Sequence, residues 1–386
     1  MDKNQREKAF LLFFSVVFLI YVLIHLPLYF QAKALIHGNE WLEKYFLPLF
    51  LILSSAYFIG RMGKKVFPEF LSRFFIHIGS FWLGAILYFY LLMLAVFILK
   101  SFLYYIDNQL YQSLKNDEGM SLMISVGIVA VTLLAGYLNA RFLNIQEYEI
   151  KIDKKPQGLD CLTIAVASDI HAGQINGKDF LSRMVKKINC LHPDLVLIAG
   201  DLVDEDVDVV EKRNMGEVFR EISAPWGIFA ISGNHEYIGN AQRAFNYFEQ
   251  YGIRFLRDEN ILLQNSIYLT GREDRDKFRF TGEKRMEAEA LANGLDKNLP
   301  LIILDHQPAD IQAIEKAGFD VCISGHTHHG QLWPLNLITK SVFLISRGYR
   351  KIGKTHFIVS NGAGTWGPPV RIGNRPEILK ITLRFN

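Results

Sequence analysis

The chain has 386 residues, half of them hydrophobic, and its formal net charge at pH 7 is +3. This length allows two or three domains, each large enough to bury an apolar core. So small a positive charge argues against a nucleic-acid-binding protein, in which lysines and arginines usually gather on one face. Cys161, Cys190 and Cys322 are too few and too widely spaced for a disulfide framework or a thiolate zinc site, so we expect buried free thiols.

Four apolar runs in the first 140 residues are long enough to cross a membrane as helices, which takes roughly 20 residues each. They cover residues 9–30, 41–60, 74–99 and 122–137. The first run follows three basic residues and could be a signal peptide, but it is too long and no small-residue cleavage site follows it. We therefore expect residues 1–145 to form a membrane domain of about four helices.

The distribution of basic residues predicts the orientation of this domain, because cytoplasmic loops carry an excess of Lys and Arg. The first and third loops carry few basic residues. The N-terminus, the second loop and the segment after the fourth run carry most of them: Lys3, Arg6 and Lys8; Arg61, Lys64, Lys65 and Arg73; Arg141, Lys151, Lys154 and Lys155. This bias predicts a multi-pass integral membrane protein with its C-terminal domain in the cytoplasm.

His25 and His77 lie inside or beside the apolar runs, where an ionisable group suggests a function. No Asp or Glu lies deep in a run to pair with either histidine. We expect neutral histidines bonded to the backbone of a neighbouring helix, and no proton path.

After residue 160, short β-rich runs alternate with amphipathic helices, which predicts a layered α/β domain over residues 161–386. Residues 146–160 are polar, contain Pro156 and are expected to be a linker. The expected strands are residues 162–168, 194–199, 227–232, 301–304 and 321–324, and the expected helices are residues 179–189, 209–222, 241–251 and 311–317.

Side chains that can bind a metal follow each of the five expected strands. In open α/β sheets the carboxyl edge is where sites form, and glycines in these segments let the backbone turn sharply. We therefore expect the five clusters to converge on one edge of a sheet. The clusters are Asp169 and His171; Asp201 and Asp204; Asn234, His235 and Glu236; Asp305 and His306; and His326 and His328.

The residue types in these clusters suit metal binding. Asp169 and His171 are two residues apart, so both can point the same way at a strand end. Asp201 follows a buried strand, where a carboxylate is costly unless it is paired or binds a metal. The amide oxygen of Asn234 and the histidine rings suit Fe, Zn or Mn. Each residue alone would be unremarkable, but the ordered series predicts a metal site.

The five motifs SDIH, GDLVD, GNHE, DH and GHTH resemble the signature of calcineurin-like metallophosphoesterases, from about residue 162 to the C-terminus. The resemblance implies a four-layer αββα sandwich. Residues 329–331 and 360–371 are similar to a membrane-linked bacterial branch of that superfamily. Many members of that branch have Gly where this chain has His329, which bears on substrate fit.

The resemblance further implies two divalent metal ions, Mn, Zn or Fe. Asp201 would bridge them, and the nucleophile would be a hydroxide bridging the two ions, which also clamp the attacking and leaving oxygens. His235 would assist the leaving group or polarise the phosphoryl oxygen rather than bind metal, and Asp204 would orient it. The implied ligands of the first ion are Asp169, His171 and His328, and those of the second are Asn234, His306 and His326.

Other polar residues near the motifs are not implied ligands. Glu236 could hold a ligand histidine or cap a helix. Asp305 and His329 have no assigned role. A guanidinium can fork onto a phosphate, but we expect Arg272, Arg371 and Arg375 to be solvated surface residues.

The sequence also favours some substrates over others. In phosphoprotein phosphatases of this superfamily an Arg follows the second motif, whereas Glu205 follows Asp204 here. A membrane anchor would raise the effective concentration of a lipid-borne substrate, so we expect hydrolysis of a phosphodiester or pyrophosphate bond in a membrane-associated lipid or lipid precursor. The alternatives are a pyrophosphohydrolase on a nucleotide-linked acylated sugar in lipid A assembly, a soluble nucleotide phosphodiesterase, and a non-catalytic membrane sensor or scaffold. No nucleic-acid partner is expected, because no basic stripe alternates with aromatics.

Overall fold

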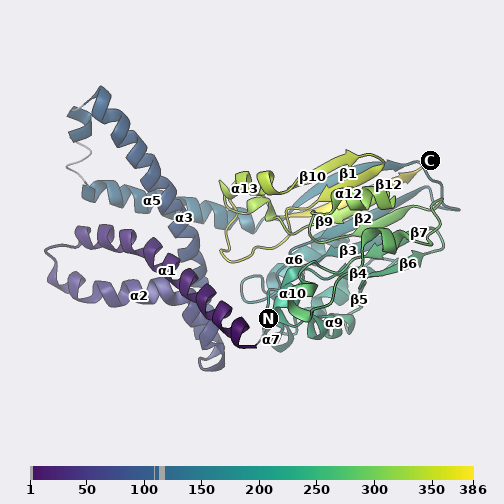
Figure 1. The fold of residues 1–386 in the computed structure, drawn as a ribbon, viewed down its shortest axis with the longest axis horizontal. Coiled ribbons are helices and arrows are strands. Elements are labelled where there is room, and N and C mark those ends of the chain that lie inside the picture. The colour runs from purple at the N-terminus through teal and green to yellow at the C-terminus, as the bar shows by residue number, and fades with distance from the viewer. Residues whose placement is uncertain (1–2, 108, 113–117) are drawn as a thin grey trace. The chain divides into compact units, whose positions relative to one another are not determined.

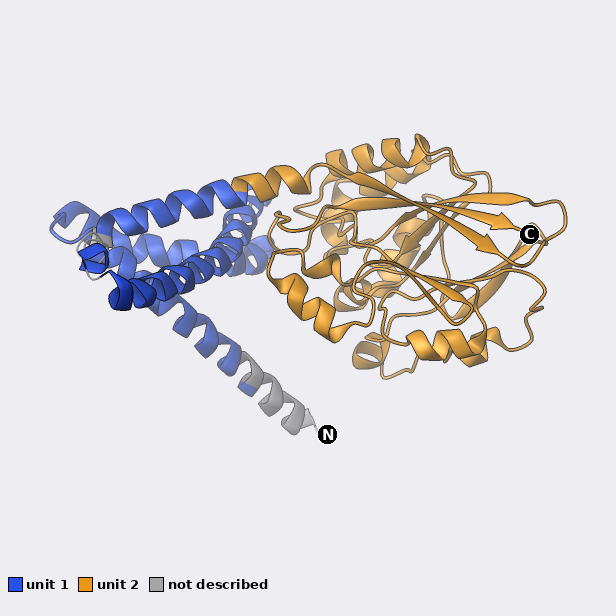
Figure 2. Ribbon diagram, turned by 90° about the horizontal axis from the view of Figure 1, so that it is seen from above, with its two compact units in different colours: residues 1–133 blue, residues 134–386 orange. Residues whose placement is uncertain are grey.

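The computed structural model describes residues 3–107, 109–112 and 118–386. The chain divides into two compact units, Met1–Leu133 and Leu134–Asn386. The division falls within one long helix, whose last residues belong to the second unit (Figure 2).

The first unit consists of long apolar helices (Figure 1). Each contains a stretch long enough to span a membrane, which confirms the four expected apolar spans. Each helix extends beyond the run expected for it, because the polar flanking residues continue the helical hydrogen bonding. The helices are α1 (Lys3–Leu35), α2 (Glu40–Met62), α3 (Glu69–Ile106) and α5 (Glu118–Ala140), with a short 3-10 turn, η1 (Gly63–Lys65), between α2 and α3.

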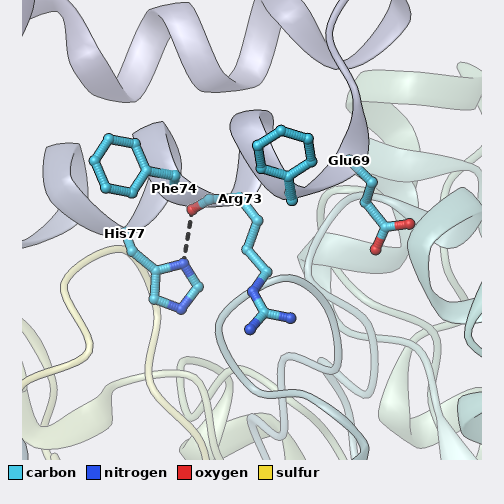
Figure 3. A pocket seen from close by; sticks show the side chains of 5 residues that line it. Glu69, Arg73, Phe74 and His77 are labelled. Atoms are coloured by element: carbon cyan, nitrogen blue, oxygen red, sulfur yellow. Dashed lines mark hydrogen bonds between the residues drawn. The ribbon is translucent and has the colours of Figure 1, made fainter.

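His25 and His77 of the first unit bond to the backbone of their own helices. The His25 Nδ1 atom lies 2.7 Å from the Tyr21 carbonyl oxygen, and its Nε2 atom accepts a hydrogen bond of 3.0 Å from Trp82 of α3. The His77 Nδ1 atom lies 2.8 Å from the Arg73 carbonyl oxygen (Figure 3). The expectation of a backbone partner on a neighbouring helix was wrong, because the carbonyl four residues earlier is the nearer acceptor.

The second unit contains two six-stranded sheets. The first has the order β1-β12-β2-β3-β4-β5, and all its neighbours are parallel except β12 and β2. Its strands are β1 (Asn144–Ile152), β2 (Cys161–Ala167), β3 (Leu195–Ala199), β4 (Ile228–Ile231), β5 (Ile253–Phe255) and β12 (Glu377–Phe385). The second has the order β10-β11-β9-β8-β7-β6. Its strands are β6 (Glu259–Leu263), β7 (Ile267–Gly271), β8 (Leu301–Leu304), β9 (Val321–Ser324), β10 (Gly348–Ile352) and β11 (Thr355–Val359).

Three buried clusters define four layers. Side chains of both sheets, such as Ile164 and Ile302, form one apolar core between the sheets. Helices α6 (Lys178–Asn189) and α9 (Ala241–Glu249) cover the outer face of the first sheet. Helices α11 (Ala288–Ala292) and α12 (Ile311–Ala317) cover the outer face of the second. The expected αββα sandwich is therefore confirmed.

Several local expectations differ from the structure. The expected helix 209–222 is broken into α7 (Val207–Lys212) and η2 (Met215–Glu221) by Asn214, whose φ of 47° is left-handed. The stretch expected as a linker contains most of β1, because its alternating residues bury Ile150 and Ile152 against the sheet. Only Cys322 of the three cysteines is buried, whereas Cys161 and Cys190 are exposed.

The remaining short elements lie mostly in the loops around the strand ends. They are α8 (Asn234–Gly239), α10 (Lys277–Thr281), η3 (His328–Gly330) and α13 (Leu335–Val342).

Candidate metal centre

The five motif loops meet at one end of the sandwich, but they come from two sheets. Asp169, Asp201 and Asn234 follow β2, β3 and β4 of the first sheet, whereas His306 and His326 follow β8 and β9 of the second. The expectation of one sheet edge was therefore wrong, and the site lies where the carboxyl ends of two packed sheets meet.

Asp169, His171 and His328 form a first cluster, whose ligand atoms all lie within 4.8 Å of one another. The Nε2 atoms of His171 and His328 are 3.0 Å apart, and the His328 Nε2 atom is 3.4 Å from the Asp169 Oδ1 atom. Ligand bonds of about 2.0 to 2.2 Å to a common ion hold neighbouring ligand atoms roughly 3.0 to 3.5 Å apart. The spacing of this cluster therefore fits a shared cation.

Asp201, His306 and His326 form a second cluster within the same limit of 4.8 Å. The Asp201 Oδ2 atom lies 3.2 Å from the His306 Nε2 atom and 3.8 Å from the Nε2 atom of His171, which belongs to the first cluster. The Asn234 Oδ1 atom lies 2.9 Å from the His326 Nδ1 atom. The carboxylate of Asp201 thus stands between the two clusters, where a bridging ligand would be needed.

The protonation and hydrogen bonding of the site fit metal ions. The His306 Nδ1 atom bonds to the Ala199 carbonyl oxygen at 2.7 Å, which leaves its buried Nε2 atom without a hydrogen-bond partner among the described residues. Burial lowers the pKa of His171 and of His328 well below the usual value, so both rings are neutral, as metal ligands must be. Burial opposes a charge on His306, yet Asp201 and other carboxylates raise its pKa well above the usual value. A cation would satisfy the same negative field.

The backbone at the site is strained. Asp169, His171, Asp201, His326 and His328 have φ angles of 51°, 47°, 51°, 69° and 44°. A left-handed conformation costs a residue other than glycine about 1 to 3 kcal/mol, and such strain persists mainly at functional sites. These side chains are held in place at the expense of stability.

Two of the motif glycines are needed for close approach and not for sharp turns. Of the three glycines before Asp201, Asn234 and His326, only Gly200 has a positive φ, of 89°. A Cβ atom on Gly233 would lie 2.1 Å from the Asp201 Oδ1 atom, and one on Gly325 would lie 2.4 Å from the Asp169 Oδ2 atom. These positions keep the carboxylates free to face the centre.

His235 lies at the mouth of the site. Its backbone N–H donates to the Asp201 Oδ1 atom at 2.9 Å, and its Nδ1 atom is 3.7 Å from the Asp204 Oδ1 atom and 3.9 Å from the Glu205 Oε1 atom. The His235 ring also stands 5.9 Å from the half-exposed ring of Trp366. An imidazole flanked by carboxylates therefore lies beside a half-exposed aromatic ring.

Glu236 holds the loops of the site together. Its Oε2 atom accepts hydrogen bonds from the backbone N–H groups of Gly233 and Asp201 at 2.6 and 3.1 Å, and its Oε1 atom accepts one from Val203 at 3.0 Å. Burial raises its pKa to about 7. The capping alternative is confirmed, and Glu236 does not hold a ligand histidine.

Arg371 is fully buried, so its expected surface position was wrong. Its guanidinium donates to the carbonyl oxygens of Gly362 and Gly364 at 3.1 and 3.2 Å and lies 3.2 Å from the Nδ1 atom of His328. Its backbone is tied to α5, since the Asn139 side chain donates to the Arg371 carbonyl oxygen at 2.9 Å. Arg371 thus contacts the Nδ1 side of the His328 ring, opposite the Nε2 atom that faces the other candidate ligands.

Arg272 is also buried, contrary to expectation. Its NH1 atom donates to Asp305 at 3.0 Å and to Asp310 at 2.9 Å, and Arg285 contacts the same two carboxylates at 2.7 Å each. Asp305 thereby anchors the segment that carries His306. These partners are far apart in the chain, so no local pattern reveals them.

Arg375, His329 and Asn176 differ in their burial and their hydrogen bonds. Arg375 is exposed, as expected. His329 is buried with its Nδ1 atom 3.1 Å from the Ser346 hydroxyl oxygen. Asn176, which has no motif, donates to the carbonyl oxygens of Ile170, His171 and Thr365 at 3.1, 3.2 and 2.9 Å. Its Oδ1 atom also accepts a hydrogen bond of 3.3 Å from the Thr365 hydroxyl group. Since Thr365 lies far away in the chain, the sequence offers no signal for this role.

A sandwich of this kind with Asp and His clusters at its strand ends defines the class of metal-dependent phosphoesterases. Residues 162–330 match the family model of the calcineurin-like phosphoesterases. An uncharacterized metallophosphoesterase of Aquifex aeolicus is 30% identical over 261 residues, which cover 66% of this chain and 98% of that protein. The chain belongs to the calcineurin-like metallophosphoesterase family.

Two further relatives match different shares of the chain. A transmembrane protein with metallophosphoesterase domain of Danio rerio is 32% identical over 275 residues, which cover 68% of this chain and 62% of that protein. An uncharacterized metallophosphoesterase of Campylobacter jejuni is 26% identical over 388 residues, which cover 97% of this chain and 99% of that protein. The chain therefore spans less than two thirds of the zebrafish relative and nearly all of the Aquifex and Campylobacter relatives.

Proposed function

We propose that this protein hydrolyses a phosphodiester or pyrophosphate bond in a membrane-associated lipid or lipid precursor. The observation that carries the reaction is the position of Asp201 between two clusters of histidines and carboxylates. In this proposal Asp201 is shared by two divalent cations, Mn, Zn or Fe. Asp169, His171 and His328 complete one site, and Asn234, His306 and His326 complete the other.

The two ions would supply Lewis acidity and lower the pKa of water, as in other two-metal hydrolases. The protein's own groups perform the remaining tasks. His235 donates a proton to the departing oxygen, and Asp204 keeps its ring oriented. Asp201 fixes the backbone of His235 through the 2.9 Å hydrogen bond and thereby sets its distance from the shared carboxylate.

Charge beside His235 favours a phosphodiester over a terminal monoester. The Glu205 carboxylate lies 3.9 Å from the His235 Nδ1 atom, next to Asp204. A dianionic phosphate monoester would be repelled there more than a monoanionic diester, because like charges in a partly buried site interact strongly. The four candidate membrane spans and the name of the zebrafish relative support a lipid-borne substrate. A nucleotide-linked acylated sugar of lipid A assembly combines a pyrophosphate with acyl chains and is the sharpest specific candidate.

Hydrolysis assays on the detergent-purified full chain test this proposal. A chromogenic phosphodiester is compared with the matching monoester, with added manganese and with chelator. We expect metal-dependent turnover of the diester that falls at least 100-fold in Asp201→Asn and in His235→Ala, in line with the loss of a metal bridge and of a general acid. An inactive protein that is shown to hold two ions would instead support a non-catalytic sensor or scaffold.

The predicted cytoplasmic orientation is tested separately. We expect a C-terminal fusion to a reporter that works only in the cytoplasm to be active. Activity of a reporter that works only outside the cytoplasm would overturn the orientation and leave the proposed reaction standing.

A further inference from the structure

Helix α13 presents apolar residues to the outside of the second unit. An amphipathic helix normally turns its apolar residues toward the core. In α13, however, Leu337, Ile338 and Val342 are 58%, 59% and 68% exposed. Trp333 before the helix and Leu344 after it are also more than half exposed. We call these five residues the apolar strip.

No residue of α13 is buried, and each of the five residues of the apolar strip is at least half exposed among the described residues. Single exposed apolar residues are common, but a continuous group of large ones marks a surface that another body covers. The strip therefore needs an occupant.

The strip adjoins the end of a candidate membrane span. The span Gly119–Ala140 runs into the second unit, where Gly136 packs closely against Val370 and Ile372. Ile372 in turn pairs with Leu332, and its carbonyl oxygen accepts a hydrogen bond of 2.8 Å from the backbone N–H of Trp333. The apolar strip thus begins one residue after Leu332, whose bridge partner Ile372 packs against the end of α5.

The residue types in and around the apolar strip are typical of the headgroup region of a membrane. Lys340 is exposed on α13, and Arg347 is exposed shortly after it. Tryptophan, together with Lys or Arg beside an apolar helix face, is typical of segments in the headgroup region. The basic side chains would also attract anionic headgroups. These charges favour a lipid surface over a protein partner.

We propose that the apolar strip inserts into the headgroup boundary of the bilayer that α5 spans, so that α13 lies flat on that membrane. The proposal rests on the membrane insertion of α5 and not on the reaction. Its consequence for the site is direct, since Phe343, which follows α13, has its ring 6.0 Å from that of His326. The metal centre would open at headgroup level.

The depth of single labels in the full chain tests the proposal. The exposed Cys161 and Cys190 are changed to Ser, and the buried Cys322 is kept. An environment-sensitive fluorophore is then placed at Ile338→Cys or Val342→Cys, and the protein is reconstituted in phosphatidylcholine–phosphatidylglycerol vesicles with or without acyl-brominated lipid. We expect blue-shifted emission at both positions and at least threefold stronger quenching by brominated lipid than at a control position.

Leu262→Cys is the control, because Leu262 is an exposed apolar residue on strand β6, at the edge of the second sheet. Melting temperatures within 2 °C of the unlabelled protein would show that each labelled chain is folded. Labels on α13 that are quenched no more than the one at Leu262 would overturn the proposal. A blue shift without quenching by brominated lipid would also overturn it, because a second copy or another protein would then cover the strip.

The label experiment is independent of catalysis. If the labels lie in the bilayer while the diester assay fails, the membrane contact of α13 is supported and the proposed reaction is overturned. If the reaction is confirmed, Ile338→Asp is expected to lower turnover of a vesicle-borne substrate at least fivefold and to leave turnover of a soluble chromogenic diester unchanged.

Discussion

Individual buried side chains explain how the candidate ligands keep their strained positions. Glu236 accepts three backbone hydrogen bonds from the loops after β3 and β4, and Arg371 supports His328 from the opposite side. Neither residue is a candidate ligand. Outer partners of this kind commonly affect metal affinity by 10- to 100-fold.

Replacement of Glu236 by Ala should destabilise the second unit. Three buried N–H groups would lose their acceptor, and each unsatisfied group costs about 1 to 3 kcal/mol. We expect a fall of several degrees in the melting temperature of the detergent-purified protein. Glu249→Ala, at an exposed position on α9, is the control and should melt within 1 °C of the parent protein. Equal melting of the two variants would contradict the role given to Glu236.

Replacement of Arg371 by Lys should weaken metal binding more than it weakens the fold. A lysine keeps the charge but lacks the planar fork that reaches Gly362, Gly364 and His328 together. We expect roughly a tenfold or greater loss of affinity for the metal, measured by titrating metal into the stripped protein. Arg375→Lys changes an exposed arginine in the same segment and should leave affinity unchanged. Unaltered affinity in Arg371→Lys would show that its contact with His328 is incidental.

At the scale of secondary structure, the strands that carry motifs were predictable and the strands that only complete a sheet were not. Strands β2, β3, β4, β8 and β9 are short and mostly apolar, and metal-competent residues follow them. Strand β1 carries Glu147, Glu149 and Lys151 on its exposed face and reads as polar. Its partner β12 lies at the far end of the sequence, so their pairing has no local signal.

The prediction of the site was limited in the same way, because contacts between distant residues have no local signal in the sequence. The candidate ligands follow strands and form recognisable motifs, so the sequence identified the residues that the structure brings together. Arg272 and Arg371 were expected at the surface, because an arginine's burial depends on distant partners such as Asp305 and Gly362. Charged side chains are rarely buried without such partners.

The glycine after β4 supports a prediction about the loop that it begins. In Gly233→Ala the new Cβ atom would lie 2.1 Å from the Asp201 Oδ1 atom, so the carboxylate or the loop must move. We expect a loss of metal binding at least as large as in Arg371→Lys. Gly177→Ala is the matched control, because its Cβ atom would meet nothing within 4 Å. Normal metal content in Gly233→Ala would refute the close-approach argument.

At the scale of the whole molecule, metal removal should be felt as a loss of stability. An ion held by the folded state at 100 times its dissociation constant stabilises that state by about 2.7 kcal/mol. We expect chelator to lower the melting temperature of the second unit and added manganese to restore it. In Asp201→Asn the shift should be much smaller. A chelator effect of equal size in that variant would place the stabilising ion elsewhere.

The position of β12 between β1 and β2 affects the order in which the protein can be built. The four apolar spans leave the ribosome first and can enter the membrane one after another, but the first sheet stays open until its last-made strand arrives. During that interval β1 has no partner in the sheet, and the edge of β2 is bare, which is a hazard for aggregation. Biogenesis is therefore expected to have two stages, with membrane insertion during translation and closure of the first sheet only after β12 has emerged.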